Sequence, residues 1–355
     1  MLRKTIPIWV ESRKKRHSGI ELLRIIAMFL VLVVHAGFFS LGAPTYEDIL
    51  SDSLPSFMRV LFQSFSIGCV DIFVLISGWF GIRPKKLNIC KFIYQCLFFL
   101  IGIYVFCLIF GFATFSLKGV AGCFLLLKWN WFIKAYLLLY IISPMLNAYI
   151  DSSTEKQHRM LLIYFYLFQT VYSWFSNAAF FFEHGYSTIS FVGLYLLARY
   201  FAKYNDVLLI LRRSLYLWFF IVSTFLMAII YFVAIRYHLN AISGRLLQYD
   251  QPLVIIGSLS LVIYFSKLNI KSSAVNWVAS SSFAVFLLHT NPNLCLPYFV
   301  PTINNLYISY NGISCIGVIF IYLVSIYVLA IAIDQIRKLG WYWLNSKTSA
   351  SFAAG

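Results

Sequence analysis

The chain has 355 residues, of which 61% are apolar, 19% aromatic and only 11% charged, and its mean hydropathy is +0.82. A soluble domain has about 45–50% apolar and about 25% charged residues. This composition excludes a soluble enzyme and a disordered protein, and it indicates a chain solvated mostly by lipid. The net charge of +16 does not indicate nucleic acid, because the basic residues stand in short clusters between apolar runs, as in multi-spanning membrane proteins.

Ten apolar runs predict membrane-spanning helices, each of which needs about twenty residues. They lie at about 20–40, 60–82, 91–114, 131–150, 160–181, 187–204, 214–235, 251–267, 274–291 and 313–334. With the N-terminus inside, 21 of the 28 Lys and Arg residues fall in cytoplasmic segments and four in outer segments. This asymmetry follows the positive-inside rule. We therefore predict an all-α bundle of about ten transmembrane helices with both termini in the cytoplasm.

Three segments follow from this topology. A basic cytoplasmic segment covers residues 1–19, a ten-span membrane domain covers 20–335, and a cytoplasmic tail covers 336–355. The loops are short, so side chains inside the bundle or at its faces must carry the function. The seven cysteines show no CxxC pair and no metal-ligand spacing, and we predict no metal site.

The first span carries two ionisable residues, Arg24 and His35, where lipid makes charge costly. They are eleven residues apart, which is close to three whole helical turns and about 16 Å along the axis. One helix face therefore presents a cation near the cytoplasm and then a titratable base deeper in the membrane. The alternatives are an interfacial Arg24 paired with Glu21 and a purely structural His35.

The second span contains Asp71 among apolar residues. A carboxylate in lipid must pair with a donor, and we expect that donor to be His35 on the adjacent span. A carboxylate that holds an imidazole in one tautomer makes it a better base. The alternative is a structural Asp71 bonded to backbone or serine.

The fourth span carries a polar and aromatic stripe, with Trp131 at its start and Tyr136, Tyr140 and Asn147 on one helix face. Sugars stack on aromatic rings, so this stripe is a candidate substrate groove. Hydrogen bonding between helices explains the same pattern equally well.

Three further residues are placed on the outer side by the predicted topology. His289 lies close to the outer end of the ninth span, and Glu183 and His184 form a carboxylate–imidazole doublet in an outer loop. We expect these groups to bind an acceptor hydroxyl. A solvated turn is the alternative for the doublet.

At these residues the chain resembles the membrane-bound acyltransferase family 3, whose ten-span members acylate bacterial surface glycans. The resemblance is carried by ELLRIIAMFLVLVVH, IGCVDIFVLISGWF and WFIKAYLLLYIISPMLN, and weaker landmarks extend it over roughly residues 18–335. The segment DIFV at 71–74 departs from the family pattern, which usually has two adjacent aromatics there.

The resemblance implies a donor, an acceptor and a place. Acetyl-CoA or another short acyl-CoA would bind from the cytoplasm, and a glycan or lipid-linked saccharide would accept the acyl group at the outer face of a bacterial cytoplasmic (inner) membrane. His35 would be the catalytic base, Asp71 would support it, and Arg24 would hold the donor. The phosphates of the acyl-CoA would also meet a basic segment containing Arg83, Lys85 and Lys86, since Arg and Lys suit phosphate groups.

Two other functions fit a polytopic chain of this kind. A transporter or flippase for a lipid-linked saccharide would show pseudo-symmetric halves with broken helices, and no such repeat is visible in the sequence. A glycan polymerase would need larger external loops than those predicted here.

The predicted topology can be tested with reporter fusions. We expect fusions near residues 87, 155, 206 and 270 to report a cytoplasmic position, and those near 48, 184, 243 and 303 an external one, because this arrangement accounts for the basic asymmetry. A reproducible inversion at any of these sites would contradict the ten-span arrangement.

Overall fold

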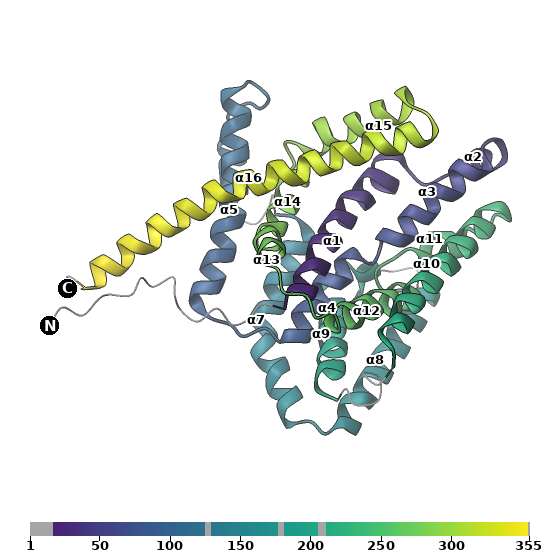
Figure 1. Cartoon of the computed structure of the whole chain (residues 1–355), viewed down its shortest axis with the longest axis horizontal. Helices are drawn as coiled ribbons and strands as arrows, with labels where there is room; N and C mark the ends of the chain where they lie inside the picture. Colours follow the sequence, from purple (N-terminus) through teal and green to yellow (C-terminus); the bar gives the residue numbers. More distant parts are fainter. Residues whose placement is uncertain (1–16, 125–128, 177–180, 205–210, 354–355) are drawn as a thin grey trace.

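The first helix, α1 (Ser18–Val34), is apolar on nearly all sides and lies in the middle of a helical bundle (Figure 1). It contacts α3, α4, α12, α13, α14 and α16. A helix that is apolar all round is stable only when it is enclosed by other helices or lipid. This central position explains why functional groups on α1 can meet residues far away in the sequence.

The computed structural model describes residues 17–124, 129–176, 181–204 and 211–353, and these residues include no strand. After α1 come η2 (His35–Phe39), α2 (Tyr46–Ser51), α3 (Ser53–Ser66), α4 (Cys69–Phe80), α5 (Lys86–Ile109), α6 (Leu117–Phe124), α7 (Trp131–Ser152), α8 (Glu155–Phe175), η3 (Glu183–Gly185) and α9 (Thr188–Lys203). The second half contains α10 (Arg213–Arg236), α11 (Asn240–Leu246), α12 (Pro252–Ser266), α13 (Ser273–Ala279), α14 (Ser282–His289), η5 (Cys295–Phe299), α15 (Val300–Ser309) and α16 (Gly312–Ala353). The predicted all-α class is confirmed for this part of the chain.

Within the described ranges, six helical stretches are long and apolar enough to cross a membrane. They are Ser18–Phe39, Ser53–Phe80, Lys86–Ile109, Trp131–Ser152, Arg213–Arg236 and Gly312–Asn345. Each matches one of the ten predicted spans, and the second combines α3 and α4. The number of long apolar helices therefore indicates a multi-pass membrane protein.

The other four predicted spans do not meet the same standard. Two of them, 251–267 and 274–291, are shorter apolar helices, Pro252–Ser266 and Ser273–His289. The span at 187–204 is the 16-residue α9, and the span at 160–181 falls mostly in α8, which begins with the polar sequence EKQHR. Residues 177–180 of that span lie outside the described part of the chain. Ten spans and cytoplasmic termini thus remain a prediction.

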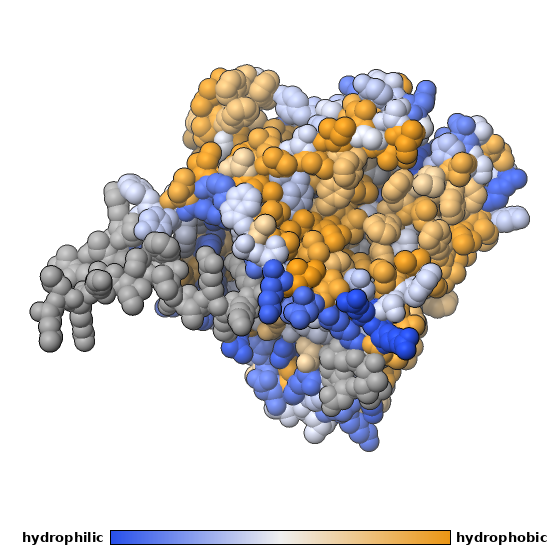
Figure 2. All heavy atoms as spheres, viewed as in Figure 1, coloured by the Kyte–Doolittle hydropathy of each residue, from blue (hydrophilic) through white to orange (hydrophobic). Residues whose placement is uncertain are grey.

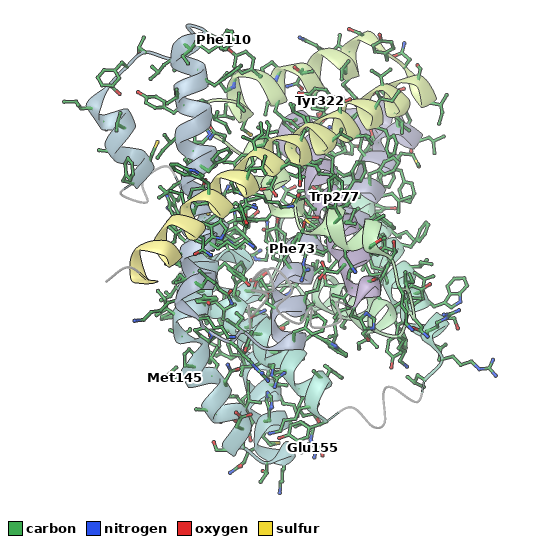
Figure 3. The ribbon with its side chains drawn as sticks, turned by 60° about the vertical axis from the view of Figure 1, so that its left-hand side comes forward. Phe73, Phe110, Met145, Glu155, Trp277 and Tyr322 are labelled. Carbon is green, nitrogen blue, oxygen red and sulfur yellow. The ribbon has the colours of Figure 1, made fainter. Side chains whose placement is uncertain are left out.

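The surface separates by polarity. Hydrophobic side chains cover the face that carries α1, α3, α15 and α16, and hydrophilic side chains gather below it, where α7, α8 and α9 meet (Figure 2). Figure 3 places Glu155 and Phe110 at opposite ends of the molecule, with Phe73 of α4 between them. Which of these two ends faces the cytoplasm stays a prediction.

Two close approaches fix the position of α4. A Cβ atom on Gly78 would lie 2.6 Å from the carbonyl oxygen of Tyr195 on α9, and one on Gly68 would lie 2.3 Å from the Ser258 hydroxyl on α12. The absence of a side chain lets the helix backbones approach closely, as is common between membrane helices.

The contact between α4 and α9 predicts the effect of a minimal substitution. We expect Gly78→Ala to destabilise the folded protein by roughly 1–3 kcal/mol, because the added methyl group meets backbone that cannot move freely. Gly102→Ala on α5 is the matched control: nothing lies within 4 Å of its Cβ position, and alanine is the better helix former. Thermal unfolding in detergent measures both, and equal unfolding temperatures would contradict the tight α4–α9 contact.

Candidate active site

His35 lies where α1 changes its helix type. The chain continues from Val34 into the π-helical turn η2, whose backbone is broken at Gly37 (φ −75°, ψ −118°). The Phe38 N–H donates to the side-chain oxygen of Gln63 on α3 (3.4 Å), and the Ser40 hydroxyl donates to the His35 carbonyl (2.6 Å). Single π turns inside α-helices are frequent at functional sites, and this one ends α1 with an imidazole.

The imidazole of His35 is paired with that of His289, which ends α14. His35 Nδ1 lies 2.8 Å from His289 Nε2, and His289 Nδ1 lies 2.6 Å from the carbonyl oxygen of Val285. His289 is only 3% exposed, and its ring contacts those of Phe286 and Phe299. The two rings therefore form a hydrogen-bonded pair that joins the first span to a helix 254 residues further along the chain.

Arg24 lies toward the other end of α1. Its Nη1 is 2.5 Å from Glu21 Oε2, and the two side chains are 30% and 11% exposed. The ion pair between Arg24 and Glu21, which was one of the alternatives from the sequence, is therefore present. The guanidinium also lies near enough to Tyr136 on α7 to interact with it electrostatically.

Tyr136 connects α7 to α4 and to the side of the bundle that holds the histidine pair. Its hydroxyl lies 3.0 Å from the Ser77 hydroxyl of α4. Its ring stacks on Phe132 (5.8 Å between centroids), and Phe132 in turn contacts Phe286, the neighbour of His289. The three predicted residues Arg24, His35 and Tyr136 thus belong to one region between α1, α4, α7 and α14.

Tyr140 and Asn147 form hydrogen bonds to the segment between α4 and α5. The Tyr140 hydroxyl accepts from the Lys85 N–H (3.0 Å), and the Asn147 amide donates to the Ile82 carbonyl (2.8 Å) while accepting from the Tyr195 hydroxyl (2.7 Å). These bonds fix the connection between α4 and α5. Hydrogen bonding between helices, the alternative for this stripe, accounts for both residues.

The connection fixed by Tyr140 borders a hollow of about 280 Å³. It is lined by Pro84, Lys85, Lys86, Ile89, Tyr140 and Ile141. Two of the cations predicted to meet donor phosphates therefore border one concave site, and the third, Arg83, is exposed beside them. Cations next to an aromatic wall suit a phosphorylated ligand.

The outer doublet sits on a strained turn. Glu183, His184 and Gly185 all have left-handed backbone, with φ of 46°, 56° and 92°. The Tyr249 N–H donates to the His184 carbonyl (3.2 Å), and a Cβ on Gly185 would lie 2.4 Å from Tyr249 Cβ. Consecutive left-handed residues other than glycine are costly and persist only where surrounding structure holds them.

This turn forms one wall of a small pocket. The pocket is lined by Tyr172, Ser173, Ser176, Phe182, Glu183, His184 and Asp250. The predicted doublet is therefore brought together with Asp250, whose carboxylate accepts from Ser173 (2.7 Å) and Gln251 (3.0 Å). Trp131 lies against the same region, because its ring contacts Tyr186 and stacks on Tyr249.

The expected pairing of Asp71 with His35 is wrong for this structure. Asp71 is fully buried, but neither carboxylate oxygen has a hydrogen-bond partner among the described residues. The charged group that interacts with it electrostatically is Asp250. On α4, Ser77 is turned by about 120° from Asp71, so the face that carries Ser77 meets α7 and the face that carries Asp71 does not.

Sequence reasoning missed three features of these sites. It took His289 for an acceptor-binding group and gave no sign that this residue pairs with His35. It also missed Ser77 as the partner of Tyr136, and Asp250 as a pocket residue. Only Asp250 had a visible signal, since YDQP is a polar interruption between apolar segments.

These features define a multi-pass helical membrane protein with an imidazole pair inside the bundle. A family model described as an acyltransferase domain matches residues 17–334, so the chain belongs to acyltransferase family 3 and is a membrane acyltransferase. The suspected family is thereby confirmed. Searches of the curated proteins and of the solved structures gave no match.

The position of Asp71 predicts how its amide variant behaves. We expect Asp71→Asn to leave the unfolding temperature unchanged or raised, because it removes a buried, unpaired carboxylate that faces Asp250. Acyl transfer per folded molecule should stay within about twofold of wild type. Thermal unfolding in detergent, combined with a transfer assay normalised to folded protein, measures both quantities.

Asp250→Asn is the matched control. It loses an acceptor for Ser173 or Gln251, and we expect about 1–3 kcal/mol of destabilisation. If Asp71→Asn folded normally but lost transfer, Asp71 would act on the active site directly, contrary to the structure.

Proposed function

We propose that this chain transfers an acetyl or other short acyl group from cytoplasmic acyl-CoA to a hydroxyl of a cell-envelope or exported glycan. The acceptor is a glycan or a lipid-linked saccharide, and the protein works in a bacterial cytoplasmic membrane. The observation that carries the proposal is the imidazole of His35, which stands inside the bundle of a family 3 acyltransferase, with Arg24 eleven residues earlier on the same span.

His35 acts as the general base of the transfer. It takes the proton of the acceptor hydroxyl as the hydroxyl oxygen attacks the thioester carbonyl. A carbon–oxygen bond forms, the carbon–sulfur bond breaks, and the proton passes from the imidazolium to the departing CoA thiolate. No oxidant, metal or further reactant is needed, so atoms and charge balance with donor, acceptor and one imidazole.

The donor enters from the end of the bundle that carries the cations. Arg24 and the hollow bordered by Lys85 and Lys86 offer positive charge to its phosphates, and Arg83 is exposed nearby. Arg24 and His35 are about 16 Å apart along the helix axis. A donor that carries its acyl group at the end of a long arm, as acyl-CoA does, can span such a distance.

The acceptor meets the site from the opposite end. Glu183, His184 and Asp250 border a pocket of only about 10 Å³, so a sugar would lie across its mouth, with Trp131 adding an aromatic face nearby. Tyr136 lies between this end and Arg24. The bonds already made by Tyr140 and Asn147 favour a supporting role for these two residues over direct contact with the acceptor.

Family membership favours group transfer over a transporter, flippase or polymerase. None of the contacts around His35 and Arg24 gives independent support to those alternatives.

The decisive experiment follows labelled acetyl from acetyl-CoA into glycan in inverted membrane vesicles. We expect His35→Ala to lower the transfer rate by about 10²–10⁴-fold, the range that a general base contributes, while the amount of inserted protein stays normal. His238→Asn is the matched control, because His238 is an exposed residue in left-handed backbone (φ 56°), which asparagine tolerates. Wild-type transfer in His35→Ala would rule out the assignment.

A second arm of the same experiment tests the donor side. We expect Arg24→Ala to raise the KM for acyl-CoA and Arg24→Lys to restore it only in part, because lysine is a point charge without a planar fork. Normal donor KM combined with poor folding would instead make Arg24 a structural partner of Glu21.

A further inference from the structure

The hydrogen bonds of His289 determine where its own proton lies. A backbone carbonyl can only accept, so the contact of 2.6 Å between His289 Nδ1 and the Val285 oxygen requires a proton on Nδ1. A neutral imidazole carries one proton. The Nε2 atom of His289 is therefore a lone-pair acceptor directed at His35.

This assignment determines the proton position on His35 as well. The contact of 2.8 Å between His35 Nδ1 and His289 Nε2 needs one donor, and His289 Nε2 has no proton to give. His35 Nδ1 must therefore donate. The single proton of a neutral His35 therefore lies on Nδ1, the atom that faces α14. The Nε2 atom of His35 has no proton and is the basic nitrogen.

The surroundings of His289 leave the pair no other arrangement. His289 is nearly fully buried, and the aromatic rings of Phe286 and Phe299 contact its ring. No charged side chain forms a described hydrogen bond with either imidazole. The relay from Val285 through His289 to His35 therefore runs in one direction.

We propose that His289 is a positioning residue that holds His35 in the Nδ1–H tautomer, so that His35 Nε2 is the atom that receives the acceptor's proton. This inference rests on the proposed role of His35 as general base. It gives His289 the task that sequence reasoning assigned to Asp71, and it replaces the expected contact of His289 with the acceptor. The acceptor hydroxyl must then approach His35 from the side opposite to α14.

Nuclear magnetic resonance tests the tautomer without any activity measurement. In wild-type protein labelled with ¹⁵N-histidine and reconstituted in bilayers, we expect the His35 signals to show a protonated Nδ1 and a bare Nε2. Signals are assigned by comparison with His35→Ala. In His289→Leu we expect a mixture of both His35 tautomers. A protonated Nε2 on neutral His35 in the wild type would overturn the proposal.

Kinetics of two polar variants tests the role in catalysis. In His289→Gln, the side-chain oxygen can stand near the position of Nε2 and accept from His35. In His289→Asn, the shorter side chain keeps its polar atoms near the position of the His289 Nδ1 atom, so they cannot reach His35. We expect Asn and Leu variants to lose about 10²-fold in kcat, at the lower end of a general base's contribution, and the Gln variant to recover to within about 10-fold of wild type.

Three further readouts separate positioning from mere support of the fold. The KM for acyl-CoA should be unchanged in all three variants. The double variant His35→Ala/His289→Leu should be no slower than His35→Ala, since groups that act as one unit are non-additive. His158→Leu removes another buried histidine, one bonded only to the Leu196 carbonyl among the described residues, and should leave kcat per folded molecule unchanged.

The outcomes distinguish failure of the inference from failure of the proposed function. Equal rates for the Gln and Asn variants, or wild-type kcat in His289→Leu, would overturn the positioning role. If the wild type transferred no acyl group to any glycan offered, the proposed function would fail, and the tautomer measured by resonance would still decide whether His289 orients His35.

Discussion

Lipid offers no hydrogen-bond partner, so a polar side chain inside this bundle is satisfied only by another part of the protein. The partners come from different helices: Tyr136 on α7 meets Ser77 on α4, and Asn147 joins α7 to Ile82 and to Tyr195 on α9. These bonds join α7 to α4, to α9 and to the connection between α4 and α5, so the polar side chains hold the helices in register. The histidine pair obeys the same rule, and chemistry and packing therefore depend on the same constraint.

The proposed reaction needs two ligands that never share an aqueous phase. The hollow beside Lys85 and Lys86 and the pocket beside Asp250 lie in different parts of the bundle, and His35 belongs to neither. The aromatic residues of α7 connect these regions, since Trp131 contacts Tyr249 while Phe132 contacts Phe286. One helix, α7, thus contacts the surroundings of both proposed ligand sites and of the imidazole.

The sequence predicts what depends on neighbours along the chain, and it fails where distant segments meet. The apolar runs predicted the long helices, and Arg24 and His35 both lie on the first of them, Ser18–Phe39. The partner of His35 could not be predicted, because it lies 254 residues away on a helix of eight residues. Asp71 misled for the same reason: its adjacency in sequence order says nothing about which helix face it occupies once α4 packs on α9.

The last helix is longer than the hydrocarbon core of a membrane is thick. α16 contains 42 residues, which corresponds to about 63 Å, whereas the hydrocarbon core is about 30 Å thick. Figure 1 shows α16 running past the rest of the bundle toward the C-terminus. It is tied to α5 where the Asp334 carboxylate accepts from Gln95, and again where the ring of Trp341 contacts that of Tyr94 (5.2 Å between centroids). Near its far end Tyr342 and Trp343 are exposed, and tyrosine and tryptophan favour the boundary between lipid and water. Tyr342 and Trp343 therefore suit the level at which α16 leaves the hydrocarbon core, and the excess length of this helix extends beyond that core.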